Sequence, residues 1–112
     1  MGVADLRILR KIALLLVLAC GSLSSSVGTV ENPIKADMPT GERAYFSRLR
    51  CSDGAPVKAR RLAAGPIGSD GHISDLIEVS CTDSAARILY IDMYHPGYVE
   101  ERAPVGFTIA PP

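Results

Sequence analysis

The residues best suited to chemistry lie near the end of the chain, at Asp92, His95 and Glu100. Pro96 and Gly97 follow the histidine, so a turn would bring the Asp92 carboxylate against the imidazole. A carboxylate that orients an imidazole is the arrangement of a general base, and with Glu100 it would describe a small hydrolase or a metal-dependent enzyme. Such a pair more often caps a turn. We therefore predict that the protein is not an enzyme and keep this activity as an alternative.

The sequence patterns that usually hold cofactors or metals are missing. Gly65, Gly68 and Gly71 form a glycine-rich run, but it lacks the Gly-Lys-Ser/Thr ending of a phosphate-binding loop. The chain has two histidines, His72 and His95, and neither stands in a metal-ligand spacing such as His-x-x-x-His. The sequence therefore predicts no cofactor and no metal.

A second candidate site is a binding surface rich in tyrosine. Tyrosine contributes a large contact area at little cost in conformational entropy, and an acidic neighbour adds polar recognition. Alternatively, these tyrosines are structural aromatics that cover the second face of a sheet. The surface would consist of Tyr90, Asp92, Tyr94, His95 and Tyr98.

The segment from Leu76 to Tyr94 predicts a β-hairpin. Apolar and polar residues alternate through Cys81, as expected of a strand with one buried face, and a polar turn follows. The second strand, from Arg87 to Tyr94, would place Leu89 in the core. A helix over 84–94 is the alternative, because alanines and an arginine begin it.

The remaining elements are predicted from shorter patterns. Ala44–Cys51 alternates like a strand, and the turn residues that follow favour a hairpin into Val57–Ala64, although Pro56 and Gly65 would also bracket a short helix there. Residues 65–74 form a loop, and Val105–Ile109 a final strand. The predicted fold class is mainly β: a small antiparallel sheet domain over 44–112 with one disulfide and the option of one short helix. An α+β fold is the alternative.

The N-terminus predicts export. Residues 1–20 combine basic residues with a short apolar run, which is typical of a signal peptide and too short to span a bilayer. The run ends in Val17-Leu18-Ala19-Cys20, which resembles the lipobox of bacterial lipoproteins, in which the cysteine becomes the lipidated first residue. Ordinary signal peptidase cleavage is the alternative. Residues 21–43 then form a flexible linker.

Three cysteines are present, an odd number. With Cys20 lipidated or removed, Cys51 and Cys81 remain in an oxidising compartment, where they would form a disulfide. Two buried free thiols are the alternative.

The 112 residues carry a formal net charge of zero, which excludes a general nucleic-acid binder. The charges are nevertheless segregated. Residues 43–61 carry six basic side chains against Asp53, and residues 70–101 carry seven acidic ones against Arg87. We expect basic and acidic strands to lie side by side and to offset each other.

The strings Arg48–Gly54 and Tyr90–Tyr98 resemble a set of small exported bacterial proteins of unassigned function. The resemblance spans about Tyr45–Phe107 and implies export and pairing of the cysteines, but no substrate or reaction. Taken together, we expect a non-enzymatic envelope protein, periplasmic or lipid-tethered, that binds another protein or an envelope component. An inhibitor or immunity-type protein of a secreted partner is a further alternative.

Overall fold

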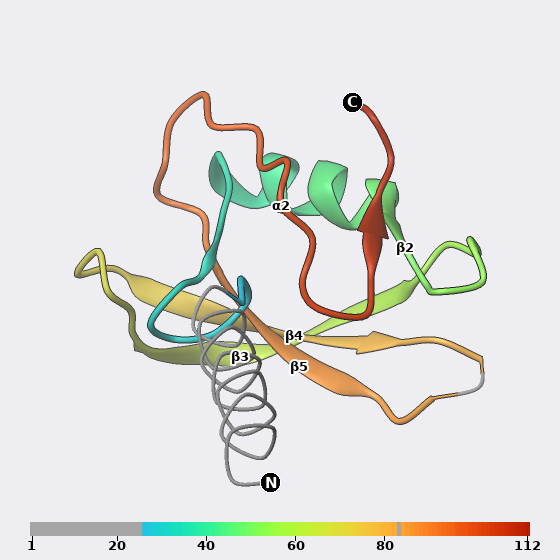
Figure 1. Cartoon of the computed structure of the whole chain (residues 1–112). Helices are drawn as coiled ribbons and strands as arrows, with labels where there is room; N and C mark the ends of the chain where they lie inside the picture. The colour runs from blue at the N-terminus through green and yellow to red at the C-terminus, as the bar shows by residue number, and fades with distance from the viewer. Residues whose placement is uncertain (1–25, 83) are drawn as a thin grey trace, which may run out of the picture.

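A four-stranded sheet forms the base of the domain in a computed structural model that describes residues 26–82 and 84–112 (Figure 1). The strand order is β1-β5-β4-β3. β3 (Lys58–Ile67), β4 (Ile73–Ser80) and β5 (Arg87–Asp92) are antiparallel neighbours, and the short β1 (Ile34–Lys35) runs parallel to β5. The predicted fold class is therefore confirmed, as is the hairpin of β4 and β5. The signal segment and Cys20 lie outside the described residues.

A single described helix, α2 (Met38–Arg48), packs on one face of this sheet together with a small ladder (Figure 1). The ladder pairs β2 (Leu49–Arg50), directly after the helix, with β6 (Thr108–Ile109) in antiparallel order. Pro39 stands in the first helical turn, where a backbone N–H would have no partner within the helix, so proline is tolerated there. The positive charge of Arg48 in the last turn stabilises the helix by its attraction to the negative end of the helix dipole.

The helix corrects two predictions. The strand expected over Ala44–Cys51 is wrong up to Arg48, and the linker expected over 21–43 is wrong for β1 and for the first turns of α2. Among α2 and Leu49, which caps its C-terminus, the buried residues are Glu42, Tyr45, Phe46 and Leu49. Their spacing is that of one helical face.

The core lies between this helical face and the inner face of the sheet. Tyr45 and Phe46 of α2 belong to the same buried cluster as Ile77, Leu89 and Ile91 of the sheet. The side-chain assignment predicted for the hairpin is therefore confirmed for the apolar residues of both strands. Asp92 at the end of β5 is buried as well, although the alternation placed it on the other face.

Cys51, just after β2, and Cys81, just after β4, form the predicted disulfide. It connects the helical layer to the end of the sheet across 30 residues of sequence. In the chain-entropy description, closing a loop of this length stabilises the fold by about 3–4 kcal/mol.

The remaining predictions are partly correct. The strand preferred over a helix for 57–64 is confirmed, but the hairpin predicted between it and Ala44–Cys51 is wrong: most of that segment is helical, and β3 pairs with β4 instead. The strand extends to Ile67, so the predicted loop 65–74 shrinks to a turn closed by a Gly68 N–H to His72 carbonyl hydrogen bond of 2.8 Å. The final strand is confirmed only for Thr108–Ile109. Arg60 and Glu78, and Arg61 and Asp75, form ion pairs between β3 and β4 at 3.1 and 3.0 Å, as the segregated charges predicted.

Candidate functional site

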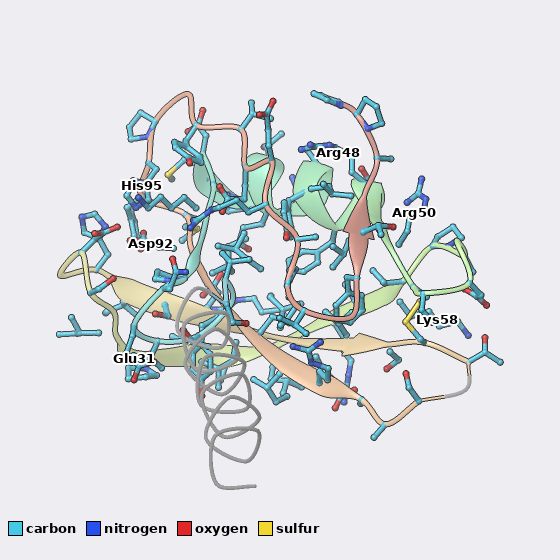
Figure 2. The ribbon with its side chains drawn as sticks, viewed as in Figure 1. Glu31, Arg48, Arg50, Lys58, Asp92 and His95 are labelled. Carbon is cyan, nitrogen blue, oxygen red and sulfur yellow. A yellow bond between two sulfur atoms is a disulfide. The ribbon has the colours of Figure 1, made fainter. Side chains whose placement is uncertain are left out.

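Two turns at one end of the sheet, one between β3 and β4 and one after β5, bring two histidines and two aspartates together. Asp92 ends β5, His95 follows it in a turn, and Asp70 and His72 lie in the turn between β3 and β4. Oδ2 of Asp92 is 2.8 Å from Nδ1 of His72 and 3.0 Å from Nε2 of His95. That same nitrogen of His95 is 3.0 Å from Oδ2 of Asp70. Figure 2 shows the Asp92 and His95 side chains next to each other at this end of the molecule. We call these four residues the His–Asp cluster.

Asp92 is the fixed centre of the His–Asp cluster. Its side chain is only 2% exposed, and its Oδ1 accepts a hydrogen bond of 2.9 Å from the backbone N–H of Tyr94. Burial by itself would raise the pKa of the carboxyl, but the hydrogen bonds from Tyr94, His72 and His95 outweigh it and the pKa lies below its ordinary value. The carboxylate is therefore held ionised and in one orientation.

The tyrosines predicted as a binding surface lie around this cluster to different degrees. The ring of Tyr94 stacks edge-on against His72, with centroids 5.5 Å apart, and the ring of Tyr98 lies 6.1 Å from that of His95. Both tyrosines are more than two-fifths exposed. Tyr90 lies two residues before Asp92 on the same face of β5 and is half-buried.

Of the residues considered for catalysis, the structure brings Asp92 and His95 together but directs Glu100 elsewhere. The Glu100 carboxyl is buried and pairs with Arg102 at 2.7 Å. Its negative charge raises the pKa of Tyr98, so it lies near the tyrosines without belonging to the His–Asp cluster.

Sequence reasoning missed His72 and Asp70 as members of the site. The signal that could have found them is the register of the predicted hairpin. Asp75 pairs with Ile91, and continuing this antiparallel register places His72 level with Tyr94, beside the Asp92–His95 turn.

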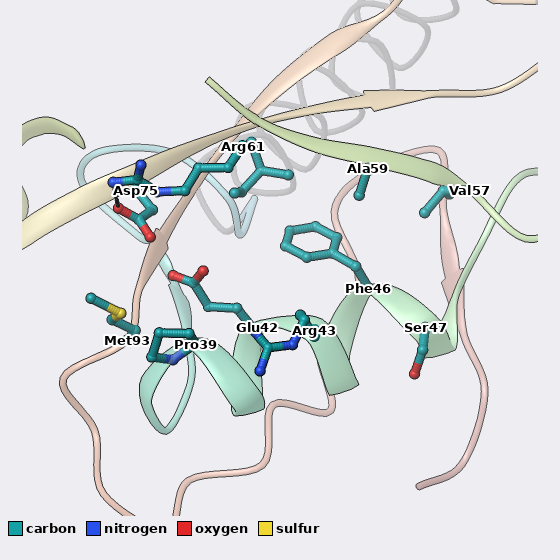
Figure 3. A pocket seen from close by; sticks show the side chains of 11 residues that line it. Pro39, Glu42, Arg43, Phe46, Ser47, Val57, Ala59, Arg61, Asp75 and Met93 are labelled. Atoms are coloured by element: carbon teal, nitrogen blue, oxygen red, sulfur yellow. Dashed lines mark hydrogen bonds and ion pairs between the residues drawn. The ribbon is translucent and has the colours of Figure 1, made fainter. Parts of the chain in front are cut away.

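A second feature is a groove of about 650 Å³ between α2 and the edge of the sheet (Figure 3). The helix covers the middle of the sheet but leaves the inner face of β3 open, so Ala59 is exposed although its side chain points toward the helical layer. We call this hollow the α2–β3 groove. Its apolar walls come from Pro39, Phe46, Val57, Ala59, Ile77 and Met93, and its polar lining from Glu42, Arg43, Ser47, Arg61 and Asp75.

The polar residues form an ionic group at one end of the α2–β3 groove. Arg61 reaches across from β3 and donates a hydrogen bond of 3.0 Å to Asp75 (Figure 3). Glu42 of α2 faces the same carboxylate. Burial, and then the hydrogen bond and negative charge of Asp75, raise the pKa of Glu42 to about 8. Glu42 is thus largely protonated at neutral pH, and Oε1 has no hydrogen-bond partner within the described residues.

The outer boundary of the α2–β3 groove is a strand edge. β3 ends the sheet and pairs only with β4 among the described strands. Its register with β4 is regular from Lys58 to Arg61, before the first irregularity. Apart from half-buried Gly65, all its residues are exposed.

Comparison with protein-family models, with curated proteins and with solved structures found no match. Within the described residues, no helix has the length and apolar character needed to cross a membrane.

Proposed function

We propose that this protein is an exported, non-enzymatic binding module that holds an extended segment of another envelope protein in the α2–β3 groove. The observation that carries the proposal is the open inner face of β3. An apolar hollow, a buried polar group at its end and a free strand edge occur together there.

The α2–β3 groove has the make-up of a binding site. Ligand sites are usually concave and mostly apolar, with a few polar groups that fix orientation. Phe46, Val57 and Ile77 provide apolar walls, and the Glu42–Asp75–Arg61 group provides the polar end. A protonated Glu42 donates its hydrogen toward Asp75 and offers Oε1 as an acceptor to a ligand that enters.

The free edge of β3 favours a peptide as the occupant. An extended segment can add to an exposed strand through main-chain hydrogen bonds, while alternate side chains fill pockets beside it. Here the regular stretch Lys58–Arg61 would supply the main-chain partners and the α2–β3 groove the pocket. Arg43 of α2 and Arg61 of β3, which line the α2–β3 groove from its two sides, favour a segment that combines apolar and acidic residues.

Three features support export. The first twenty residues have the composition of a signal peptide, Cys20 stands at a lipobox-like boundary, and the Cys51–Cys81 disulfide is compatible with an oxidising compartment. We propose that lipidation of Cys20 tethers the mature chain to a membrane, with a soluble periplasmic or secreted form as the alternative product of cleavage.

Peptide selection with purified protein tests the binding site. The protein, isolated from cell envelopes in its oxidised form, selects from a library of displayed peptides. We expect recovered peptides to combine apolar and acidic residues. Their binding should be lost in Ala59→Trp, which fills the α2–β3 groove, and should persist in Lys58→Trp, the matched control on the opposite face of the same strand.

The choice of variants makes the test specific. Both residues are exposed, so neither substitution places a large side chain in the core. Peptides that bind Ala59→Trp and the unchanged protein equally would place the binding site elsewhere. Recovery of a single tight, stoichiometric protein partner from the secreted fraction would favour the inhibitor or immunity-type alternative.

A further inference from the structure

The His–Asp cluster contains more acceptor atoms than its hydrogens can serve. Nε2 of His95 lies 3.0 Å from a carboxylate oxygen of Asp70 and equally far from one of Asp92. A ring nitrogen carries at most one hydrogen, so the two oxygens would have to share it in a bifurcated hydrogen bond. Nδ1 of His72 meets the same Oδ2 of Asp92 at 2.8 Å. The two imidazole nitrogens and the Asp92 carboxylate thus converge on one small volume, and Asp70 borders it through its contact with His95.

The distances match those between the ligands of a small metal ion. Zinc bound at about 2.0–2.1 Å by nitrogen or oxygen in a tetrahedron has neighbouring ligand atoms roughly 3.3 Å apart. The three contacts in the His–Asp cluster measure 2.8 to 3.0 Å, so a small outward movement of each side chain would accommodate the ion. The donor atoms of His72, Asp92 and His95 all lie within 4.8 Å of one another.

The chemistry of the donors selects the class of metal. Imidazole nitrogens suit zinc and its first-row neighbours, whereas magnesium and calcium prefer ligand sets made of oxygen. Two aspartates with two neutral histidines carry two negative charges, which a divalent cation would neutralise. Asp92 is already oriented by the Tyr94 N–H at its other oxygen, as outer hydrogen bonds orient metal ligands.

We propose that His72, Asp92 and His95, with Asp70 as the fourth ligand, bind a divalent transition metal of the zinc class. The ion would connect the turn between β3 and β4 to the turn after β5. Because all four protein ligands are present, the site has the character of a closed, structural centre. The inference stands apart from the proposed function, since no ligand of the cluster lines the α2–β3 groove.

The test uses zinc alone with the full mature protein, made without added histidines and first stripped with a chelator. We expect one equivalent of Zn²⁺ per chain to be retained after dialysis. The sequence contains only two histidines, both in the cluster, so nitrogen NMR of the imidazoles reports on the site directly. Zinc should shift Nδ1 of His72 and Nε2 of His95, and Co²⁺ in its place should give the visible absorption of a tetrahedral centre.

Two variants and a matched control complete the experiment. Asp92→Asn keeps an acceptor for the Tyr94 N–H but removes the charge, and His72→Gln changes a residue whose side chain is 39% exposed. Each should weaken zinc binding by more than the roughly 10–100-fold that loss of an outer-shell partner costs. Asp53→Asn, an exposed acid outside the cluster, should bind like the unchanged chain.

Unchanged imidazole signals at saturating zinc would overturn the proposal and leave the cluster a hydrogen-bonded network. Equal affinity in the unchanged chain, Asp92→Asn and His72→Gln would do the same. The NMR measurement needs no variant, so it decides the matter even if Asp92→Asn does not fold.

Discussion

Glu42 should make the folded protein less stable as the pH rises toward 8. Its carboxyl is 6% exposed and faces Asp75, and its pKa is raised from 4.5 to about 8 by burial and by that neighbour. Between these two values the folded chain holds a proton that the unfolded chain has lost. Unfolding then releases a proton, so the free energy of unfolding falls with rising pH and levels off above about 8.

The size of the effect follows from the pKa difference. One pKa unit corresponds to about 1.4 kcal/mol, so the change from 4.5 to about 8 amounts to at most about 5 kcal/mol. The carboxyl borders the open α2–β3 groove, from which water can reach the charged form, and Arg61 and Arg43 favour that form. We therefore expect about half of the maximum, roughly 2–3 kcal/mol.

The assay compares Glu42→Gln with the unchanged protein by urea unfolding across this pH range, with the disulfide intact. Glutamine keeps a donor toward Asp75 but does not titrate, so the stability difference between the two proteins should shift in favour of Glu42→Gln as the pH rises. The difference removes the pH-dependent contributions to stability that both chains share. Asp75 affects the pH dependence of stability only at lower pH. Burial would raise its pKa, but the hydrogen bonds from Arg61 and Glu42 outweigh burial and lower it.

The same substitution at an exposed glutamate, Glu31→Gln, provides the control. Parallel stability curves for Glu42→Gln and the unchanged protein between pH 4.5 and 8 would refute the assignment of a raised pKa to Glu42.

Two further predictions concern the cysteines. Replacing Cys51 and Cys81 together with alanine should lower the free energy of unfolding by about 3–4 kcal/mol, measured by urea unfolding; a loss below about 1 kcal/mol would mean that the bridge adds little to the fold. The intact mass of the mature protein from cell envelopes should correspond to a chain that begins at Cys20 and carries a lipid; an unlipidated chain beginning later in the segment would establish the soluble alternative.

The hairpin of β4 and β5 was predictable because the pattern that specifies each strand lies in consecutive residues. Ile77, Val79, Leu89 and Ile91 alternate with polar or half-exposed residues, and all four are buried as that alternation requires. The strand over 57–64 was preferred because a hairpin turn precedes it, and the strand does form, but its partner is β4. Cys51 and Cys81 could be paired by elimination, since the predicted export would leave no other cysteine in the domain.

The helix was missed because two patterns overlap in its second half. Tyr45 and Leu49 also fit a strand alternation when reading begins at Ala44, whereas the helical spacing becomes visible only when Glu42 is included. A buried glutamate is an unexpected core residue, and Pro39 and Gly41 resembled the punctuation of a linker. In the structure, Glu42 is accommodated by taking up a proton beside Asp75.

The candidate sites also differ in whether their contacts are local in sequence or depend on how distant segments pack. The contact of Asp92 with His95 spans three residues and was predicted from a turn, whereas His72 reaches Asp92 only through the register of two strands. The α2–β3 groove depends on how a helix that was not predicted packs against an edge strand. No local pattern in the sequence contains that information.

The most direct test of the proposed function is photo-crosslinking in living cells, with the reactive group placed at Ala59 in the α2–β3 groove. We expect one dominant envelope-protein adduct from position 59 and none from position 58 on the opposite face of the strand. Adducts that form from Tyr98 and not from Ala59 would contradict it and would assign binding to the tyrosine surface around the His–Asp cluster.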